Sequence, residues 1–151
     1  MVQSERVRGR LPRRVARRSM VKIVGLGWLE TRTDAYEELV RFYRDGMGLP
    51  LDHSEPDFAI FRLPDGSRVE VFGPSDSEHR HFSTGPVAGF VVEDIDAARV
   101  ELERAGATFI GPVHGEPGGD RWAHFRAPDG NVYEITRSPT FRASRQGAAS
   151  R

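Results

Sequence analysis

The chain has 151 residues, of which 38% are hydrophobic and 29% charged, with 22 basic and 22 acidic side chains. This length and composition predict one globular domain, and no apolar run approaches the roughly 20 residues that cross a bilayer, so we expect no membrane partner. The absence of cysteine excludes disulfides, thiolate metal sites and a cysteine nucleophile.

The N-terminal segment is strongly basic. Residues 1–19 hold seven Arg and one Glu, a balance of 7 − 1 = +6, which leaves 15 Lys and Arg against 21 Asp and Glu, or −6, for the rest. We expect a disordered extension here, with an arm that binds nucleic acid or an anionic surface as the alternative. The acidic remainder indicates that the domain itself binds no nucleic acid.

A strand and a helix follow this segment. The residues "VKIVGLGWLETR" (21–32) mix β-branched and apolar side chains without a helical period, which is typical of a strand. In "TDAYEELVRFYRDGMGL" (33–49) the apolar side chains recur with helical spacing, which predicts an amphipathic helix. Thr33 or Asp34 is the expected N-cap, and Glu37 would complete a capping box with Asp34.

Three short strands are predicted next, around residues 51–53, 58–63 and 67–72. Pro64-Asp65-Gly66 supplies the turn between the last two, because Pro fixes φ and Gly accepts positive φ. The first half of the chain therefore has the order β-α-β-β-β.

The second half repeats this order. A strand is predicted in "GPVAGFVVED" (85–94), a helix in "DIDAARVELERAGA" (94–107), a strand in "TFIGPV" (108–113) and a hairpin in "RWAHFRAPDGNVYEIT" (121–136). We place the two copies at about residues 21–75 and 86–138, joined by a linker at 76–85, within one domain that spans 20–138. The small polar residues of 139–151 predict a flexible tail.

The two copies also share a nearly identical stretch. "FRLPDGSRVEV" (61–71) and "FRAPDGNVYEI" (125–135) lie 64 residues apart and match at Phe, Arg, Pro, Asp, Gly and Glu. Because strands alternate faces, Glu70 and Glu134 should point away from the apolar neighbours that pack on the helices. We predict an α+β fold in which the tandem βαβββ repeats form a cupped, half-barrel mixed sheet, with both carboxylates facing one cavity. Two such carboxylates would repel each other, which raises one pKa and suits a general base.

The tandem pattern, the "FYRDGMGL" helix end (42–49), the "PDG…E" hairpins and "VVEDIDAA" (91–98) together resemble the vicinal-oxygen-chelate superfamily. This is the glyoxalase, bleomycin-resistance and ring-cleaving dioxygenase group, and the resemblance covers about three quarters of the chain. It implies the cupped fold. For the metal enzymes of the group it also implies a divalent ion, held by His or Gln from the first strand of each half and by Glu from the last strand of each half.

Carried onto this sequence, the resemblance implies Glu70 and Glu134 as last-strand metal ligands. The first-strand pair is missing, since one of residues 26–28, among them Trp28, occupies the ligand place in the first half and Val87 that in the second. Two carboxylates without imidazole hold a divalent ion weakly, because zinc-type sites use three protein ligands or more. No firm cofactor follows, and a divalent metal is the alternative.

Four other side chains are candidates for the cavity. His81, in "SEHRHF", and His124, on the hairpin strand beside Glu134, are candidates for substrate contact or for rebuilding a metal site with the two carboxylates. The alternative is that His81 is an ordinary polar loop residue and that His124 is a half-buried strand residue bonded to a neighbour. Trp28 and Trp122 are expected to wall the cavity and stack on a flat or apolar ligand, although core packing is the more frequent fate of such residues.

Three functions remain open. The leading one is a protein that binds a small molecule in the cavity between the repeats without the usual complete metal site, like the bleomycin-resistance members. The alternatives are a divalent-metal-dependent lyase or dioxygenase of the glyoxalase type, and a metal-free enzyme that uses Glu70 or Glu134 as base. We expect a small-molecule ligand, a homodimer that covers the open sheet edges, and a cytoplasmic location, since nothing demands an oxidising compartment.

Overall fold

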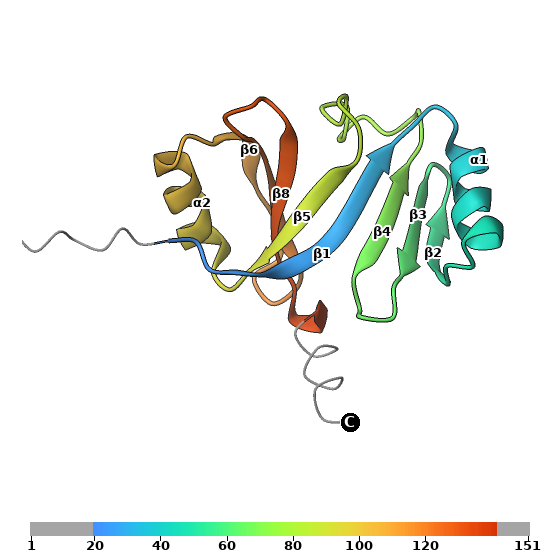
Figure 1. The fold of residues 1–151 in the computed structure, drawn as a ribbon, viewed down its shortest axis with the longest axis horizontal. Coiled ribbons are helices and arrows are strands. Elements are labelled where there is room, and N and C mark those ends of the chain that lie inside the picture. The colour runs from blue at the N-terminus through green and yellow to red at the C-terminus, as the bar shows by residue number, and fades with distance from the viewer. Residues whose placement is uncertain (1–19, 142–151) are drawn as a thin grey trace, which may run out of the picture.

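The computed structural model describes residues 20–141 (Figure 1). The expected N-terminal extension at 1–19 and residues 142–151 lie outside the described residues. Within them, eight strands form one mixed sheet with a helix at either half, which confirms the predicted α+β class and the tandem repeat.

The first copy contains one helix and four strands. Strand β1 (Ile23–Arg32) leads into α1 (Tyr36–Arg41), and one turn of π-helix (Phe42–Gly46) extends that helix. The other strands are β2 (Leu51–Glu55), β3 (Phe58–Arg62) and β4 (Arg68–Phe72).

The second copy follows the same order. Its elements are β5 (Val87–Val92), α2 (Ile95–Arg104), β6 (Thr108–Gly115), β7 (Arg121–Arg126) and β8 (Val132–Arg137). The strand order in the sheet is β2-β3-β4-β1-β5-β8-β7-β6. In each copy the first strand pairs in parallel with the last, and the two copies meet where β1 and β5 pair antiparallel. The sheet therefore has an approximate twofold relation between its halves.

Each helix covers its own half of the sheet (Figure 1). Helix α1 contributes Tyr36 and Val40 to a core with Val69 and Val71 of β4, and α2 contributes Ile95 to a second core with Ile135 of β8. Since β-strand side chains alternate faces, the carboxylates that lie between these apolar residues point to the opposite side of the sheet.

The predicted capping box is wrong. The N-cap of α1 is Ala35, without a side-chain hydrogen bond, because the Thr33 hydroxyl accepts instead from the Ala35 backbone N–H at 3.1 Å. Helix α2 has a side-chain N-cap, Asp94, whose carboxylate accepts a hydrogen bond from the Ala97 backbone N–H at 3.0 Å.

The C-terminal end of the described chain is packed into the fold. Phe141, which the sequence prediction placed in the tail, is only 1% exposed and contacts Trp28 and Val91 in a small apolar cluster. The ordered fold therefore extends past residue 138. No helix among the described residues has the length and apolar character needed to span a membrane.

Candidate functional site

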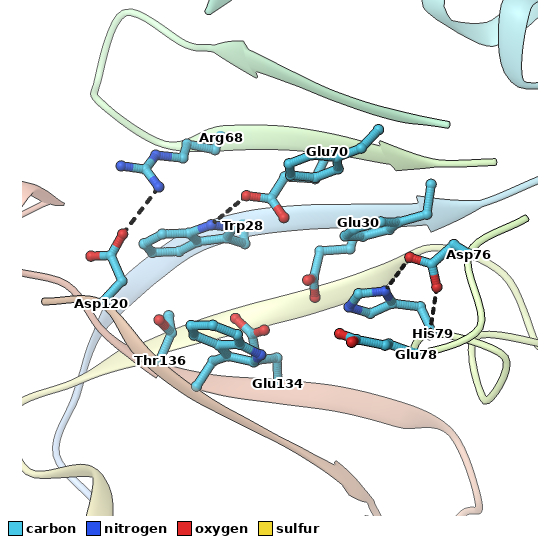
Figure 2. A pocket seen from close by; sticks show the side chains of 13 residues that line it. Trp28, Glu30, Arg68, Glu70, Asp76, Glu78, His79, Asp120, Glu134 and Thr136 are labelled. Atoms are coloured by element: carbon cyan, nitrogen blue, oxygen red, sulfur yellow. Dashed lines mark hydrogen bonds and ion pairs between the residues drawn. The ribbon is translucent and has the colours of Figure 1, made fainter. Parts of the chain in front are cut away.

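A cavity of about 350 Å³ opens on the face of the sheet opposite the helices. Strands β1, β4 and β8 and the loop that joins the two copies supply most of its wall (Figure 2). Its lining residues are Trp28, Glu30, Phe58, Arg68, Glu70, Phe72, Asp76, Glu78, His79, Asp120, Trp122, Glu134 and Thr136.

Three buried carboxylates converge on this cavity. Glu30 of β1 and Glu134 of β8 are each 3% exposed, and Glu70 of β4 is 9% exposed. Glu30 and Glu70 are direct neighbours across the parallel pair of β1 and β4. Burying like charges close together is costly unless protons or cations neutralise them.

Burial is the main cause of the raised pKa of both Glu70 and Glu134. It raises the pKa of Glu70 to about 7, and the neighbouring Glu30 charge adds to the rise. The indole Nε1–H of Trp28 donates to Oε1 of Glu70 at 3.0 Å and partly opposes it. Burial and Glu30 likewise raise the pKa of Glu134 well above its usual range. Glu70 is therefore poised to exchange a proton near neutral pH.

The imidazole of His124 lies against two of these carboxylates. It stands directly opposite Glu134 on the neighbouring strands β7 and β8, with Nε2 3.2 Å from Oε2 of Glu134 and 3.8 Å from Oε2 of Glu30. Burial alone would lower the pKa of His124, but the two carboxylates outweigh it and raise the pKa to about 9.

These contacts are close but poorly aligned for hydrogen bonding. Among the described residues, the buried polar side-chain atoms without a hydrogen-bond partner are Oε2 of Glu30, Oγ1 of Thr31 and Nε2 of His124. Two of these three atoms, Oε2 of Glu30 and Nε2 of His124, lie 3.8 Å apart at the edge of the cavity. An unpartnered buried polar atom is unusual in folded proteins and calls for an explanation such as a bound ion.

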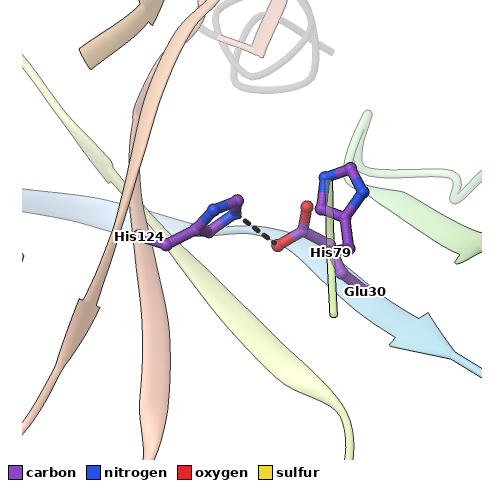
Figure 3. A group of neighbouring side chains, drawn as sticks. All are labelled: Glu30, His79 and His124. Carbon is purple, nitrogen blue, oxygen red and sulfur yellow. Dashed lines mark ion pairs between the residues drawn. The ribbon is translucent and has the colours of Figure 1, made fainter. Parts of the chain in front are cut away.

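The loop between the copies adds two more imidazoles. His79 bonds through Nδ1 to Asp76 at 2.8 Å, and its ring stacks on Phe72 with centroids 3.8 Å apart. Glu30, His79 and His124 each offer one ligand atom such that all three atoms lie within 4.8 Å of one another (Figure 3). Two imidazoles and a carboxylate are a ligand combination that proteins use for divalent transition metals.

His81 stands behind His124. Its Nε2 is 3.1 Å from Nδ1 of His124, and burial together with the nearby His124 and His79 lowers the pKa of His81 to about 4. A neutral His81 accepts the Nδ1–H of His124, which leaves Nε2 of His124 directed at the carboxylates.

The residues singled out from the sequence thus occupy one region. Glu70, Glu134, Trp28 and Trp122 line the cavity. His124 lies just outside that lining, against Glu134, and His81 contacts it from the far side. Their chemical roles stay predictions.

The structure shows a first-strand carboxylate that sequence reasoning missed. The register pairs Glu30 with Glu70 and Gly89 with Glu134, so each first strand has a residue directly beside the last-strand carboxylate, two positions after Trp28 and Val87. Glu30 precedes Tyr36 by 36 − 30 = 6 residues and Gly89 precedes Ile95 by 95 − 89 = 6, so Glu30 and Gly89 are equivalent positions of the two repeats.

Gly89 makes room for its neighbours. A Cβ atom added there would come within 2.8 Å of Oε1 of Glu134 and 3.0 Å of Cβ of Trp28. No side chain fits without moving both residues. The second copy therefore has no side chain at the position equivalent to Glu30, and His124 of β7 places a nitrogen 3.2 Å from Glu134 instead.

Several solved structures share this fold. Methylmalonyl-CoA epimerase from Mycobacterium tuberculosis is 19% identical, with a TM-score of 0.63 over 83% of this chain and 95% of that one. The Mn(II)-bound glyoxalase from Novosphingobium aromaticivorans is 19% identical, with a TM-score of 0.62 over 78% of this chain and 40% of that one. A Streptomyces coelicolor methylmalonyl-CoA epimerase variant in complex with 2-nitronate-propionyl-CoA is 16% identical, with a TM-score of 0.59 over 78% of this chain and 99% of that one.

Sequence comparison gives the family directly. None of the curated protein sequences matches the chain. The sequence profile of one superfamily does match, over residues 25–135, which includes most of both repeats and every carboxylate of the cavity. The chain belongs to the Glyoxalase/Bleomycin resistance protein/Dioxygenase superfamily.

Proposed function

We propose that the cavity binds one divalent cation and catalyses proton transfer on a small molecule, as a metal-dependent enzyme of the glyoxalase type. Glu30, His124 and Glu134 would hold the cation, with His79 completing the set. The observation that carries this proposal is the pair of orphaned buried atoms, Oε2 of Glu30 and Nε2 of His124, 3.8 Å apart.

The donor set fits a divalent ion. Carboxylate oxygens and imidazole nitrogens suit Mn²⁺, Fe²⁺, Zn²⁺ and related ions. A cation would neutralise the repulsion among the three buried carboxylates and give both orphaned atoms a partner. The Asp76 carboxylate on Nδ1 of His79 and the His81 ring on Nδ1 of His124 leave the Nε2 atom of each ligand imidazole available.

A bound cation would supply polarisation of a substrate oxygen. The chain's own residues supply the proton transfer. Glu70, with a pKa raised to about 7 by burial, is ionised in part at neutral pH and can take a proton from a carbon next to a carbonyl. Trp28 holds Oε1 of Glu70, so Oε2 is the oxygen that would accept the proton.

Two of the similar structures support this class of activity. One is a glyoxalase bound to Mn(II), and the other is a methylmalonyl-CoA epimerase. Both names denote reactions on small molecules, and the second denotes inversion at one carbon centre. The same fold with a carboxylate of near-neutral pKa beside a cation-binding cluster favours proton transfer over oxygen chemistry here.

Deuterium exchange tests the proposal. The protein is incubated with Mn²⁺ in D₂O with small 2-oxo acids, hydroxyketones and acyl thioesters, and deuterium at the carbon beside the carbonyl is followed by NMR. We expect exchange with at least one compound, reduced about 100-fold in Glu70→Gln. Glu38→Gln, a change on the exposed side of α1, is the matched control and should exchange as the wild type does. Equal exchange by the wild type and Glu70→Gln would reject Glu70 as base.

The second candidate is metal-free binding of a small molecule. The aromatic side chains of Trp28, Trp122, Phe58 and Phe72 in the cavity wall favour it, because they offer stacking surface to a flat ligand. Purified protein that retains no divalent ion after dialysis against Mn²⁺, Fe²⁺ or Zn²⁺, yet binds aromatic compounds, would select this function over the first.

Assembly and location stay predictions. We expect a homodimer, because β2 and β6 leave open edges at the two ends of the sheet. We also expect a cytoplasmic location, because nothing in the cysteine-free sequence demands an oxidising compartment. Sedimentation velocity of the full chain tests the dimer, and a monomer at micromolar concentration would contradict it.

A further inference from the structure

We propose that Arg68 is the anion-recognition residue of this cavity, and that the substrate is therefore a small carboxylic acid with a flat, unsaturated body. The inference rests on the proposed function, because the acid occupies the same cavity. Its carboxylate lies at Arg68, and the oxygens of its reacting end lie at the opposite end, beside Glu30 and His124. It adds the chemical class of the substrate and the residue that selects it.

Arg68 is placed to reach a ligand. It lies two residues before Glu70 on β4, so both side chains point to the cavity face of the sheet. Among the described residues that line the cavity, Arg68 is the only Lys or Arg. Its side chain is 17% exposed, which means that an anion beside it would be largely shielded from water. A charge-assisted hydrogen bond is strongest in such a place.

The Arg68 guanidinium has N–H donors that its protein partners do not use. Nη1 donates to Oδ2 of Asp120 at 3.1 Å, and Nη2 donates to Oγ1 of Thr140 at 3.4 Å. A guanidinium carries five N–H donors, so these two bonds leave three for a ligand. Asp120 is fixed in turn, because Oγ of Ser138 donates to its Oδ1 at 2.5 Å. Asp120 therefore holds Arg68 in position. Its carboxylate also competes with the carboxylate of a ligand for the guanidinium group.

Trp28 connects the anion end to the acidic end. The Arg68 guanidinium lies 5.3 Å from the centre of the Trp28 ring, and the same indole donates to Glu70. In Figure 2 Arg68 and Asp120 lie on one side of the cavity and His79 and Asp76 on the other, with Trp28 and Glu30 between them. A molecule that spans these ends rests its body on the Trp28 ring, which favours a flat ligand.

Opposite effects of two substitutions on the same ion pair test this assignment. The probes are benzoate, salicylate and phenylpyruvate, each paired with its neutral amide, and binding is followed by quenching of tryptophan fluorescence. We expect the acids to bind and their amides to bind much more weakly. Arg68→Gln should weaken acid binding about tenfold, whereas Asp120→Asn should strengthen it about threefold by removing the competing charge.

A structural role for the ion pair gives a different result. If the pair only joins the two repeats, both substitutions lower the melting temperature and weaken every probe alike, which would overturn the proposal. Acids and amides binding equally, or no acid binding at all, would also overturn it.

Mn²⁺ affinity of the same proteins, measured by electron paramagnetic resonance, separates this inference from the proposed function. Acid binding with opposite shifts but no Mn²⁺ binding would reject the metal site and keep the anion site. Mn²⁺ binding without selective acid binding would reject the anion site and keep the metal site.

Discussion

His124 and Glu134 face each other across β7 and β8, with Nε2 and Oε2 3.2 Å apart. The equivalent pair in the first copy is Ile60 and Glu70 on β3 and β4. The repeats thus share the last-strand carboxylate and differ in its neighbour. The first copy adds Glu30 on its first strand, and the second copy adds His124 on the strand beside its carboxylate. Together the two halves bring Glu30, His124 and Glu134 into one cluster, which neither half contains in full.

Gly89 is predicted to be essential for this cluster. In Gly89→Ala the new Cβ would lie 2.8 Å from Oε1 of Glu134, so we expect the unfolding free energy to fall by about 1–3 kcal/mol and Mn²⁺ affinity to fall with it. Gly118→Ala is the matched control, because a Cβ there meets nothing within 4 Å. Urea denaturation and Mn²⁺ titration of both variants check the prediction, which fails if the two behave alike.

Glu70 is predicted to make stability depend on pH. Its pKa is raised from 4.5 to about 7 by burial and by Glu30, so the folded protein holds this proton between those values. The contribution of the carboxyl to stability is therefore present below pH 4.5 and lost as the pH rises through 7.

Replacing Glu70 by glutamine removes that dependence. In metal-free buffer we expect Glu70→Gln to be more stable than the wild type by about 2–3 kcal/mol at pH 8, and nearly equal to it at pH 4. Denaturant unfolding across this range measures the difference, with Glu38→Gln as control. A difference that does not change with pH would contradict the assigned burial of the Glu70 charge.

The two bonded histidines are predicted to titrate far apart. The pKa of His124 is raised to about 9 by Glu134 and Glu30 in spite of burial, whereas burial and His124 lower that of His81 to about 4. At pH 7 without metal, ¹⁵N NMR should show His124 with protons on both nitrogens and His81 neutral. The stabilising effect of the His124 charge should be present below pH 6.5 and lost as the pH rises through 9. Two ordinary titrations near pH 6.5 would refute the arrangement.

Much of the fold follows from local sequence. The duplicated PDG hairpins, the helical spacing of Tyr36 and Val40, and the alternation around Glu70 and Glu134 predict the repeat and the inward direction of both carboxylates. These features need only neighbours along the chain. The same reasoning misplaced the N-cap of α1, because Thr33 bonds one residue short of the helix.

The full site could not be predicted, because it depends on register between strands. Glu30 was overlooked since "GWLETR" reads as an ordinary strand end, and only the pairing of β1 with β4 places it beside Glu70. His79 lies in a loop whose course the sequence does not determine, and its closeness to His124 is a contact between residues 45 positions apart (124 − 79 = 45).

Titration of the metal-free protein with Mn²⁺, followed by electron paramagnetic resonance, tests the central claim most directly. We expect one ion per chain, with affinity reduced at least about tenfold in Glu30→Gln and in His124→Gln, and unchanged in Glu38→Gln. Wild-type protein that binds no Mn²⁺, Fe²⁺ or Zn²⁺, or variants that bind as tightly as the wild type, would contradict the account.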